Sequence, residues 1–190
     1  MSHAARAAAC LLALGAPAAA ADALAPGSRM LSLIDGAGAA LPVAELRLDP
    51  PDATGAQGFA VIWNDALFGD YFLSMRPFKC LEGPDQLWCR VPYPYAIARR
   101  IGPGDLTDLE YATLFVWKRK GDYGIDLWNG VYYVLEPGPD GALTGRLHDY
   151  DMNALGIPPD AGDLRPIAPG DLTIGPEDGR WLPGISIAAP

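Results

Sequence analysis

The chain contains one group of residues with the chemistry of acid–base catalysis. His148 lies between acidic residues in the run Arg-Leu-His-Asp-Tyr-Asp at 146–151. Asp149 and Asp151 could orient the imidazole, and Ser74 or a bound water would then act as the nucleophile. Ser74 is not in a G-x-S-x-G context, and a lone histidine at a strand end is more often a hydrogen-bonded bystander. A hydrolase of envelope material is therefore the alternative hypothesis.

The same run resembles the first and last ligands of a calcium loop. Oxygen-bearing side chains stand at alternate positions and again at the twelfth, namely Asp149, Asp151, Asn153 and Asp160. Such donors surround a hard cation in EF-hand loops. The sixth position holds Ala154 in place of glycine, and two prolines at 158–159 precede the final ligand. The favoured interpretation is that Asp151 caps a short helix over 152–155, and calcium is the alternative.

A third group of candidates consists of residues that could stack against a ligand. The candidate ligand-binding residues are Trp128, Asn129, Tyr132 and Tyr93, with Trp63 and Tyr95 as further aromatics. Aromatic rings stack on sugars, and a neighbouring amide would bind their hydroxyl groups. Strand aromatics mostly fill cores, and the adjacent residues Tyr132 and Tyr133 must point to opposite faces of a strand. We expect at least one of these two tyrosines in the core.

The N-terminal segment has the parts of a secretory signal peptide. Arg6 is followed by an apolar run and an alanine-rich stretch with an A-x-A pattern, which predicts a leader over residues 1–21. Its removal would leave two cysteines, Cys80 and Cys89, which we expect to form a structural disulfide in an oxidising compartment. Their spacing is not the C-x-x-C of a redox dithiol. The sequence therefore predicts a periplasmic protein.

Charge and composition argue against several classes of partner. The 190 residues carry a formal net charge of −9, and nucleic acids require a basic surface. No segment after the leader is long and apolar enough for a membrane span. The sequence contains no G-x-G-x-x-G, P-loop, H-E-x-x-H or paired C-x-x-C motif. We therefore expect neither a nucleic-acid partner nor a cofactor, apart from the calcium considered above.

Short apolar runs between glycine, proline and aspartate predict an all-β fold. Strands are expected over 44–49, 58–63, 71–75, 87–91, 114–117, 131–135 and 142–147. A short helix is expected near Thr107, because Thr107 and Glu110 have the spacing of a capping box. The clearest hairpin joins the last two strands. The pattern favours an antiparallel barrel or sandwich with one or two short helices.

An internal repeat suggests how the domain is organised. Residues 99–107 (RRIGPGDLT) recur at 165–173 (RPIAPGDLT), and IWND at 62–65 is echoed by LWNG at 127–130. We interpret this as the duplication of a module of about 65 residues. The expected organisation is one β-rich domain over 22–190, with an extension at 22–56 and repeat halves at 57–122 and 123–190. The alternative is a turn-and-cap sequence used twice.

These observations favour a function without catalysis. The leading hypothesis is an exported soluble protein for binding or envelope assembly, which holds a small molecule, a glycan or an envelope protein. This hypothesis rests on a shortage of catalytic groups, since the sequence has one histidine outside the leader and no nucleophile motif. The alternatives are a hydrolase that uses His148 and a domain stapled by calcium.

Overall fold

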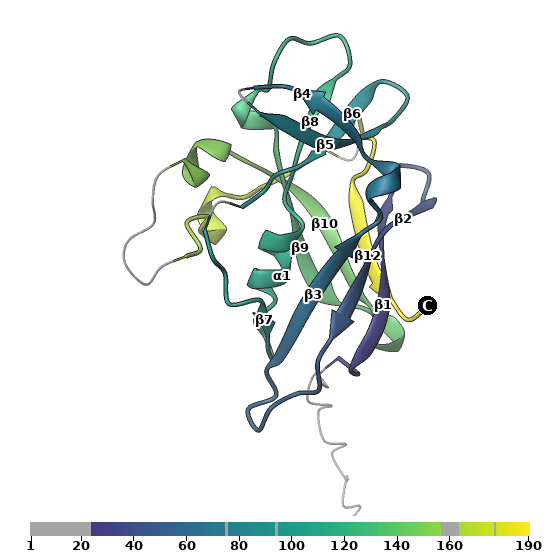
Figure 1. The fold of residues 1–190 in the computed structure, drawn as a ribbon, viewed down its shortest axis with the longest axis vertical. Helices are drawn as coiled ribbons and strands as arrows, with labels where there is room; N and C mark the ends of the chain where they lie inside the picture. The colour runs from purple at the N-terminus through teal and green to yellow at the C-terminus, as the bar shows by residue number, and fades with distance from the viewer. Residues whose placement is uncertain (1–23, 75, 94, 157–163, 177) are drawn as a thin grey trace, which may run out of the picture.

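The structure, a computed structural model, describes residues 24–74, 76–93, 95–156, 164–176 and 178–190. The chain forms an all-β domain with a few short helices, as the sequence predicts (Figure 1). The strands are β1 Gly27–Ile34, β2 Ala40–Leu48, β3 Gln57–Trp63, β4 Gly69–Phe72, β5 Pro77–Glu82, β6 Gln86–Arg90, β7 Arg100–Ile101, β8 Phe115–Arg119, β9 Gly130–Pro137, β10 Leu143–Tyr150, β11 Thr173–Ile174 and β12 Gly184–Ala188. The helical elements are α1 Thr107–Ala112 and the short 3₁₀ helices η1 Asp65–Leu67, η2 Leu127–Asn129, η3 Pro139–Gly141, η4 Met152–Leu155 and η5 Pro169–Asp171.

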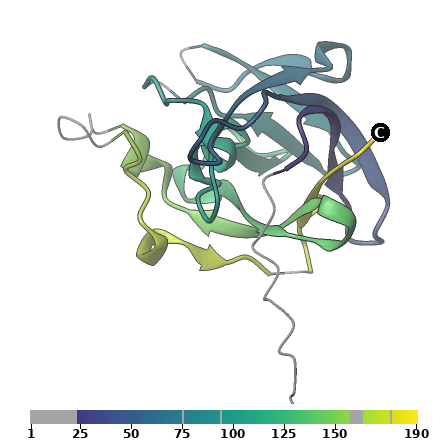
Figure 2. The same cartoon turned by 90° about the horizontal axis from the view of Figure 1, so that it is seen from below.

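The strands form one antiparallel sheet in which most strands pair with their neighbours in the chain. The order along the sheet is β4-β5-β6-β8-β9-β10-β12-β1-β2-β3-β7, and β11 is added to β10. Because β12 returns to pair with β1, the sheet curls around an interior, which is seen along the long axis in Figure 2. β3 and β4 are joined through η1 but are not neighbours in the sheet. We call the space between β3 and the neighbouring ends of β5 and β6 the seam.

Alternation along the strands divides the apolar side chains between two faces of the sheet. Leu31 of β1, Leu46 of β2 and Trp88 of β6 belong to the main core inside the curled sheet. On β9, Tyr133 joins this core, whereas Tyr132 joins a second buried cluster that includes residues of α1, β10 and η4. Both tyrosines are buried, which confirms the prediction that at least one of them lies in the core.

The predicted disulfide is present and joins two neighbouring strands. Cys80 of β5 faces Cys89 of β6 in the sheet register, and their sulfur atoms are bonded. Both side chains are fully buried beside Phe78, Leu87 and Val116. The bridge therefore constrains one local hairpin, and it plays no part in closing the sheet.

The structure does not confirm the internal duplication. Matching segments enter different elements: residues 62–65 end β3 and begin η1, whereas residues 127–130 form η2 and begin β9. The second pair also differs, because the motif at 99–107 leads into α1, whereas the motif at 165–173 forms η5 and then β11. The strands of the two proposed halves belong to one continuous sheet.

The predicted helix is present, but its cap differs from the prediction. α1 begins at Thr107, and Leu106 is the capping residue without a side-chain hydrogen bond. Asp105 Oδ1 accepts from the backbone N–H of Thr107 at 3.1 Å, so the acid before the helix performs the role expected of Thr107. Among the described residues, no helix is long and apolar enough to cross a membrane.

Candidate functional site

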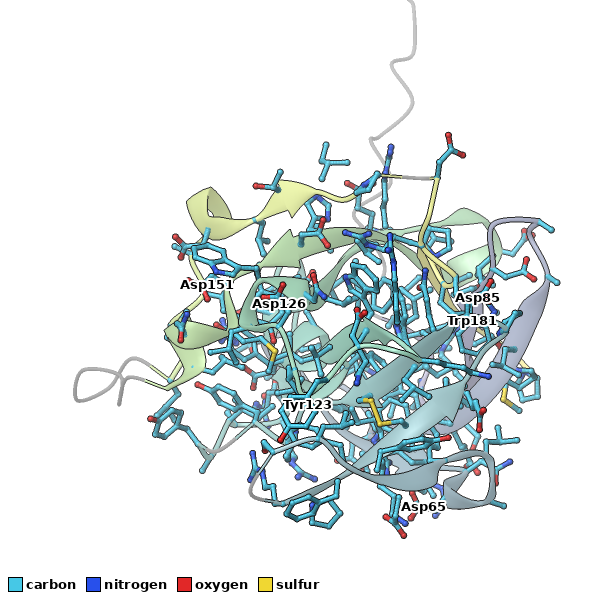
Figure 3. The ribbon with its side chains drawn as sticks, turned by 90° about the horizontal axis from the view of Figure 1, so that it is seen from above. Asp65, Asp85, Tyr123, Asp126, Asp151 and Trp181 are labelled. Carbon is cyan, nitrogen blue, oxygen red and sulfur yellow. A yellow bond between two sulfur atoms is a disulfide. The ribbon has the colours of Figure 1, made fainter. Side chains whose placement is uncertain are left out.

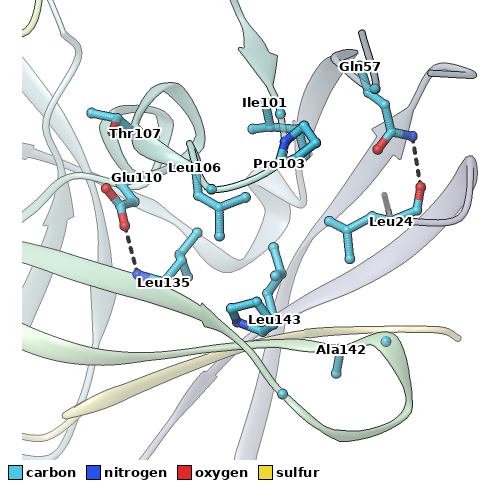
Figure 4. Close-up of a pocket in the computed structure, with 16 residues that line it drawn as sticks. Leu24, Gln57, Ile101, Pro103, Leu106, Thr107, Glu110, Leu135, Ala142 and Leu143 are labelled. Carbon is cyan, nitrogen blue, oxygen red and sulfur yellow. Dashed lines mark hydrogen bonds between the residues drawn. The ribbon is translucent and has the colours of Figure 1, made fainter. Parts of the chain in front are cut away.

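A cavity of about 620 Å³ lies between α1 and the turn that joins β9 to β10 (Figure 4). Its walls are largely apolar and include Ile101, Leu106, Leu135 and Leu143. These side chains come from β7, the loop before α1, β9 and β10. The volume is within the range of small-molecule sites, which are mostly apolar with a few polar groups. We call this space the mouth cavity.

Two tight turns shape the mouth cavity. In the first, Gly104 has a φ of 78° and Gly102 forms an isolated bridge with Asp105, so the chain reverses directly before α1. In the second, Asp140 and Gly141 have φ values of 55° and 67°, the left-handed conformation that glycine and aspartate tolerate best. Arg29 fixes this turn by donating to the carbonyl oxygen of Gly141 at 2.8 Å. The local sequence therefore determines the rim of the cavity.

The polar lining contains one buried carboxyl group. Glu110 of α1 lines the cavity and is only 8% exposed. Its Oε1 accepts from the backbone N–H of Leu135 at 2.8 Å, and its Oε2 accepts from the hydroxyl of Tyr132 at 2.5 Å. Burial raises the pKa of Glu110, and these two hydrogen bonds reduce the rise without cancelling it. The site therefore holds a carboxyl group that is easier to protonate than an ordinary glutamate.

Gln57 anchors the opposite wall of the mouth cavity. Its side chain is almost fully buried, and its Nε2 donates to the carbonyl oxygens of Leu24 at 2.8 Å and Asp49 at 2.9 Å. These bonds hold Leu24 in the lining of the cavity. Figure 4 shows Gln57 and Leu24 on one side of the space and Glu110 with Leu135 on the other.

A network of charges next to the cavity holds α1 in place. Asp108 is buried and accepts from the backbone N–H of Arg100 at 3.1 Å and from the guanidinium of Arg165 at 2.6 and 2.9 Å. Arg165 also donates to Asp105 at 2.9 Å. Both arginines belong to the two copies of the repeated motif. The motif thus supplies an ion-pair network that positions the element bearing Glu110.

The structure does not join the predicted acid–base residues into one constellation. His148 is half-buried on β10, and its Nδ1 lies 3.0 Å from the carbonyl oxygen of Arg146. Asp149 contacts the guanidinium of Arg180 at 3.1 and 3.2 Å. Ser74 is exposed in the segment between β4 and β5. Within the described parts of the chain, no hydrogen bond links His148 to Ser74, Asp149 or Asp151.

The residues of the proposed calcium loop have other partners. Asp151 caps η4, because its Oδ1 accepts from the backbone N–H of Asn153 at 2.9 Å and from the Asn153 amide at 2.8 Å. This confirms the interpretation as a helix cap. Asp126 caps η2 in the same way, and Figure 3 shows Asp126 and Asp151 at the same end of the molecule. Asp160 lies outside the described residues, and among those described no group of three or more metal-ligating side chains is found.

The four predicted ligand-binding residues do not form a single platform. Trp128 is 68% exposed on η2, and Asn129 beside it is half-buried. Tyr132 is buried under α1 with its hydroxyl on Glu110. Tyr93 belongs to the segment after β6, and its ring packs edge-on against Tyr95 and Tyr111. Of these four residues, only Tyr132 contacts the carboxyl group of Glu110 in the mouth cavity.

Sequence reasoning missed Glu110 and Gln57 as site residues. The Thr-x-x-Glu spacing suggested that Glu110 faces its own helix end, whereas its partners belong to β9, 22 and 25 residues further along. The one available signal was an acid between the apolar residues Leu109 and Tyr111.

Comparison with known protein families, with curated proteins and with solved structures finds no match to this chain.

Proposed function

We propose that the protein is an exported, non-enzymatic binding protein that holds a small, mostly apolar molecule in the mouth cavity. The observation that carries this proposal is a cavity of about 620 Å³ whose apolar walls contain one buried carboxyl group. Burial of the apolar body of a ligand would supply most of the affinity. Glu110 would fix the orientation of the ligand.

Glu110 suits the role of an anchor. Each of its oxygens already accepts one hydrogen bond from the protein, and a carboxylate oxygen has room for a second. An N–H or O–H group on the ligand would complete the set. In surroundings of low polarity such a bond is stronger than in water, so the ligand class is an apolar body with one hydrogen-bond donor.

The composition of the lining favours binding over hydrolysis. Among the described residues that line the mouth cavity, Glu110 is the only titratable side chain and Thr107 carries the only hydroxyl. A hydrolase needs a nucleophile and a base within hydrogen-bond reach of each other, and this lining supplies no such pair. Because glycans require many polar partners, the same lining also favours an apolar ligand over a glycan.

Export to the periplasm remains part of this proposal. The leader pattern over residues 1–21 supports it, although those residues lie outside the described part of the structure. The buried disulfide between Cys80 and Cys89 also supports it, because structural disulfides persist in oxidising compartments.

A fluorescence titration with N-phenyl-1-naphthylamine tests the proposal. This neutral probe has an apolar body and one N–H, and its emission rises when it leaves water. We expect saturable binding to the wild-type protein. Ala142→Trp adds a large ring at a residue that lines the cavity and should weaken binding at least about tenfold, since it fills the space that the probe requires.

Two controls make this experiment specific. Ala60→Trp places the same ring on the exposed face of β3 and should leave probe binding unchanged. In competition, 1-phenylnaphthalene has a similar shape but no N–H, so it should bind several-fold more weakly than the amine if Glu110 accepts from the ligand. The proposal fails if the probe does not bind, or if both tryptophan variants bind it like the wild type.

A further inference from the structure

A second cavity, of about 580 Å³, lies in the seam between β3 and the ends of β5 and β6. Phe59, Val61 and Trp63 line it from β3, and Tyr93, Tyr95 and Arg99 line it from the segment that follows β6. It shares no lining residue with the mouth cavity. We call it the seam cavity, and it is independent of the function proposed above.

The backbone of β3 presents an unused edge to the seam cavity. The backbone N–H of Asp49 donates to the carbonyl oxygen of Gly58, and the backbone N–H of Asn64 donates to the carbonyl oxygen of Val43. The even-numbered residues of β3 therefore direct their backbone N–H and C=O groups towards β2. The odd-numbered residues therefore face the seam, and Phe59 N–H does so by donating to Arg99 O at 3.1 Å. Beyond that bond, Val61 and Trp63 pair with no strand on the seam side among the described residues.

The lining of the seam cavity is also positively charged. Its described lining contains Lys79, Arg90 and Arg99 and no acid, although the whole chain carries a net charge of −9. Lys79 is paired with Asp70, and Arg90 is paired with Asp65. In the described part of the chain the exposed side chain of Arg99 has no ion pair or hydrogen bond. It is therefore the cation available to a ligand.

Arg99 is held beside the strand edge by an unusual backbone. Its φ is 53°, a left-handed conformation that is strained for a residue other than glycine. In this conformation its carbonyl oxygen accepts from Phe59 while the residue still lines the cavity. The free edge of β3 thus runs directly towards a cation.

We propose that the seam cavity binds the C-terminal end of an extended peptide as an added antiparallel strand on β3. The peptide backbone would pair with Val61 and Trp63, as in other cases of strand addition. β3 runs from residue 57 to residue 63, so an antiparallel strand ends beside Phe59 and Arg99, where its terminal carboxylate meets the guanidinium. A parallel strand would bring a positive N-terminus to the same cation. The aromatic walls take apolar side chains from the last residues.

Dansyl-labelled tetrapeptides test this inference on the whole protein. The probe is the pool dansyl-Gly-Ala-X-X, where X is Ala, Val, Leu or Phe, with a free C-terminal carboxylate. Two matched pools carry a C-terminal amide or N-methylated backbone nitrogens at alternate positions. We expect the free acid to bind at least about tenfold more tightly than the amide. N-methylation should also weaken binding, because it removes the donors that a strand pair needs.

Two matched variants distinguish the effect of Arg99 on peptide binding from the effect of the overall charge of the protein. Arg99→Gln should reduce the preference for the free acid to less than about threefold. Arg119→Gln makes the same change at an exposed position of β8 outside the cavity and should retain the full preference. The inference is overturned if no pool binds, if the amide binds as tightly as the acid, if N-methylation has no effect, or if both variants behave alike. Binding of N-phenyl-1-naphthylamine should be the same in both variants, so failure here is distinct from failure at the mouth cavity.

Discussion

At the scale of single residues, the central feature is a carboxyl group placed where water is scarce. Glu110 is buried against the apolar wall of the mouth cavity, and its two oxygens hold β9 through Tyr132 and Leu135. Tyr132 is itself buried, and burial together with the adjacent carboxylate raises the pKa of its phenol. The phenol therefore remains a hydrogen-bond donor to Glu110 at any ordinary pH. One pair of side chains thus serves both the packing of α1 and the polarity of the site.

The raised pKa of Glu110 predicts how stability depends on pH. Folding favours the protonated form of this group, so its contribution to the free energy of unfolding is largest below its ordinary pKa of 4.5 and declines as the pH rises through the higher pKa of the folded state. Glu110→Gln removes this titration. Relative to Glu110→Gln, the wild type should lose stability as the pH rises above the ordinary pKa of 4.5, as measured by urea unfolding.

A matched control is Glu136→Gln at an exposed position of β9. The stability of this variant should follow that of the wild type as the pH rises, because the side chain of Glu136 is exposed and makes no contact with the mouth cavity. A stability difference between wild type and Glu110→Gln that grows in favour of the wild type with rising pH would contradict the assigned direction of the pKa shift.

Local residue roles were predictable from the sequence, and long-range roles were not. Asp151 as a cap depends on a backbone N–H two residues away, and spacing alone identifies such a contact. Glu110 accepts hydrogen bonds from Tyr132 and Leu135, which are 22 and 25 residues away, so its role depends on how α1 packs against β9. His148, which sequence reasoning considered first, is held by the carbonyl of Arg146.

At the scale of elements, alternating strands were predicted where the pattern is regular and missed where it is interrupted. The predicted hairpin of β9 and β10 is present, because its alternation and its turn sequence are both local. β1, β5, β7, β11 and β12 were not predicted as strands. β5 carries Cys80, one of the two cysteines that were predicted to pair, and β12 is recognisable as a strand only by its pairing with β1 and β10.

The disulfide gives a prediction about the hairpin of β5 and β6. It closes a short loop with a sequence separation of 9 residues, for which loop entropy gives about 2 to 3 kcal/mol of stabilisation. Urea unfolding with a reductant present throughout should lower the free energy of unfolding by that amount. The double variant Cys80→Ala, Cys89→Ala serves as the control, because it should be insensitive to the reductant. Equal wild-type midpoints with and without reductant would contradict this role.

At the scale of the whole molecule, the strands of the two predicted halves belong to one continuous sheet, and the duplication that the repeat suggested is not confirmed. Both copies of the repeated motif form a tight turn before an element, one before α1 and one before β11. Closure depends on β12 returning to β1 across almost the full described chain. Similarity between two turns carries no information on such a pairing, so the sequence predicted the fold class but not the order of the strands in the sheet.

The overall charge predicts which ligands the mouth cavity prefers. The chain carries a net charge of −9, and the described lining of the mouth cavity holds an acid and no cation. 1-Anilinonaphthalene-8-sulfonate shares the ring system of N-phenyl-1-naphthylamine but is an anion. It should therefore bind at least about tenfold more weakly at low salt, and the difference should narrow in about 0.5 M salt, where charges are screened. Binding of the anion to the wild type as tight as that of the neutral amine at low salt would contradict this prediction, provided that Ala142→Trp weakens the binding of both probes.

The most direct test of the binding function is a crystal structure of the wild-type protein with N-phenyl-1-naphthylamine. We expect the probe to occupy the space between α1 and the turn joining β9 to β10, with its N–H within hydrogen-bond distance of the Glu110 carboxyl group. Electron density for the probe at another surface, with only water between Leu106 and Leu143, would contradict binding in the mouth cavity.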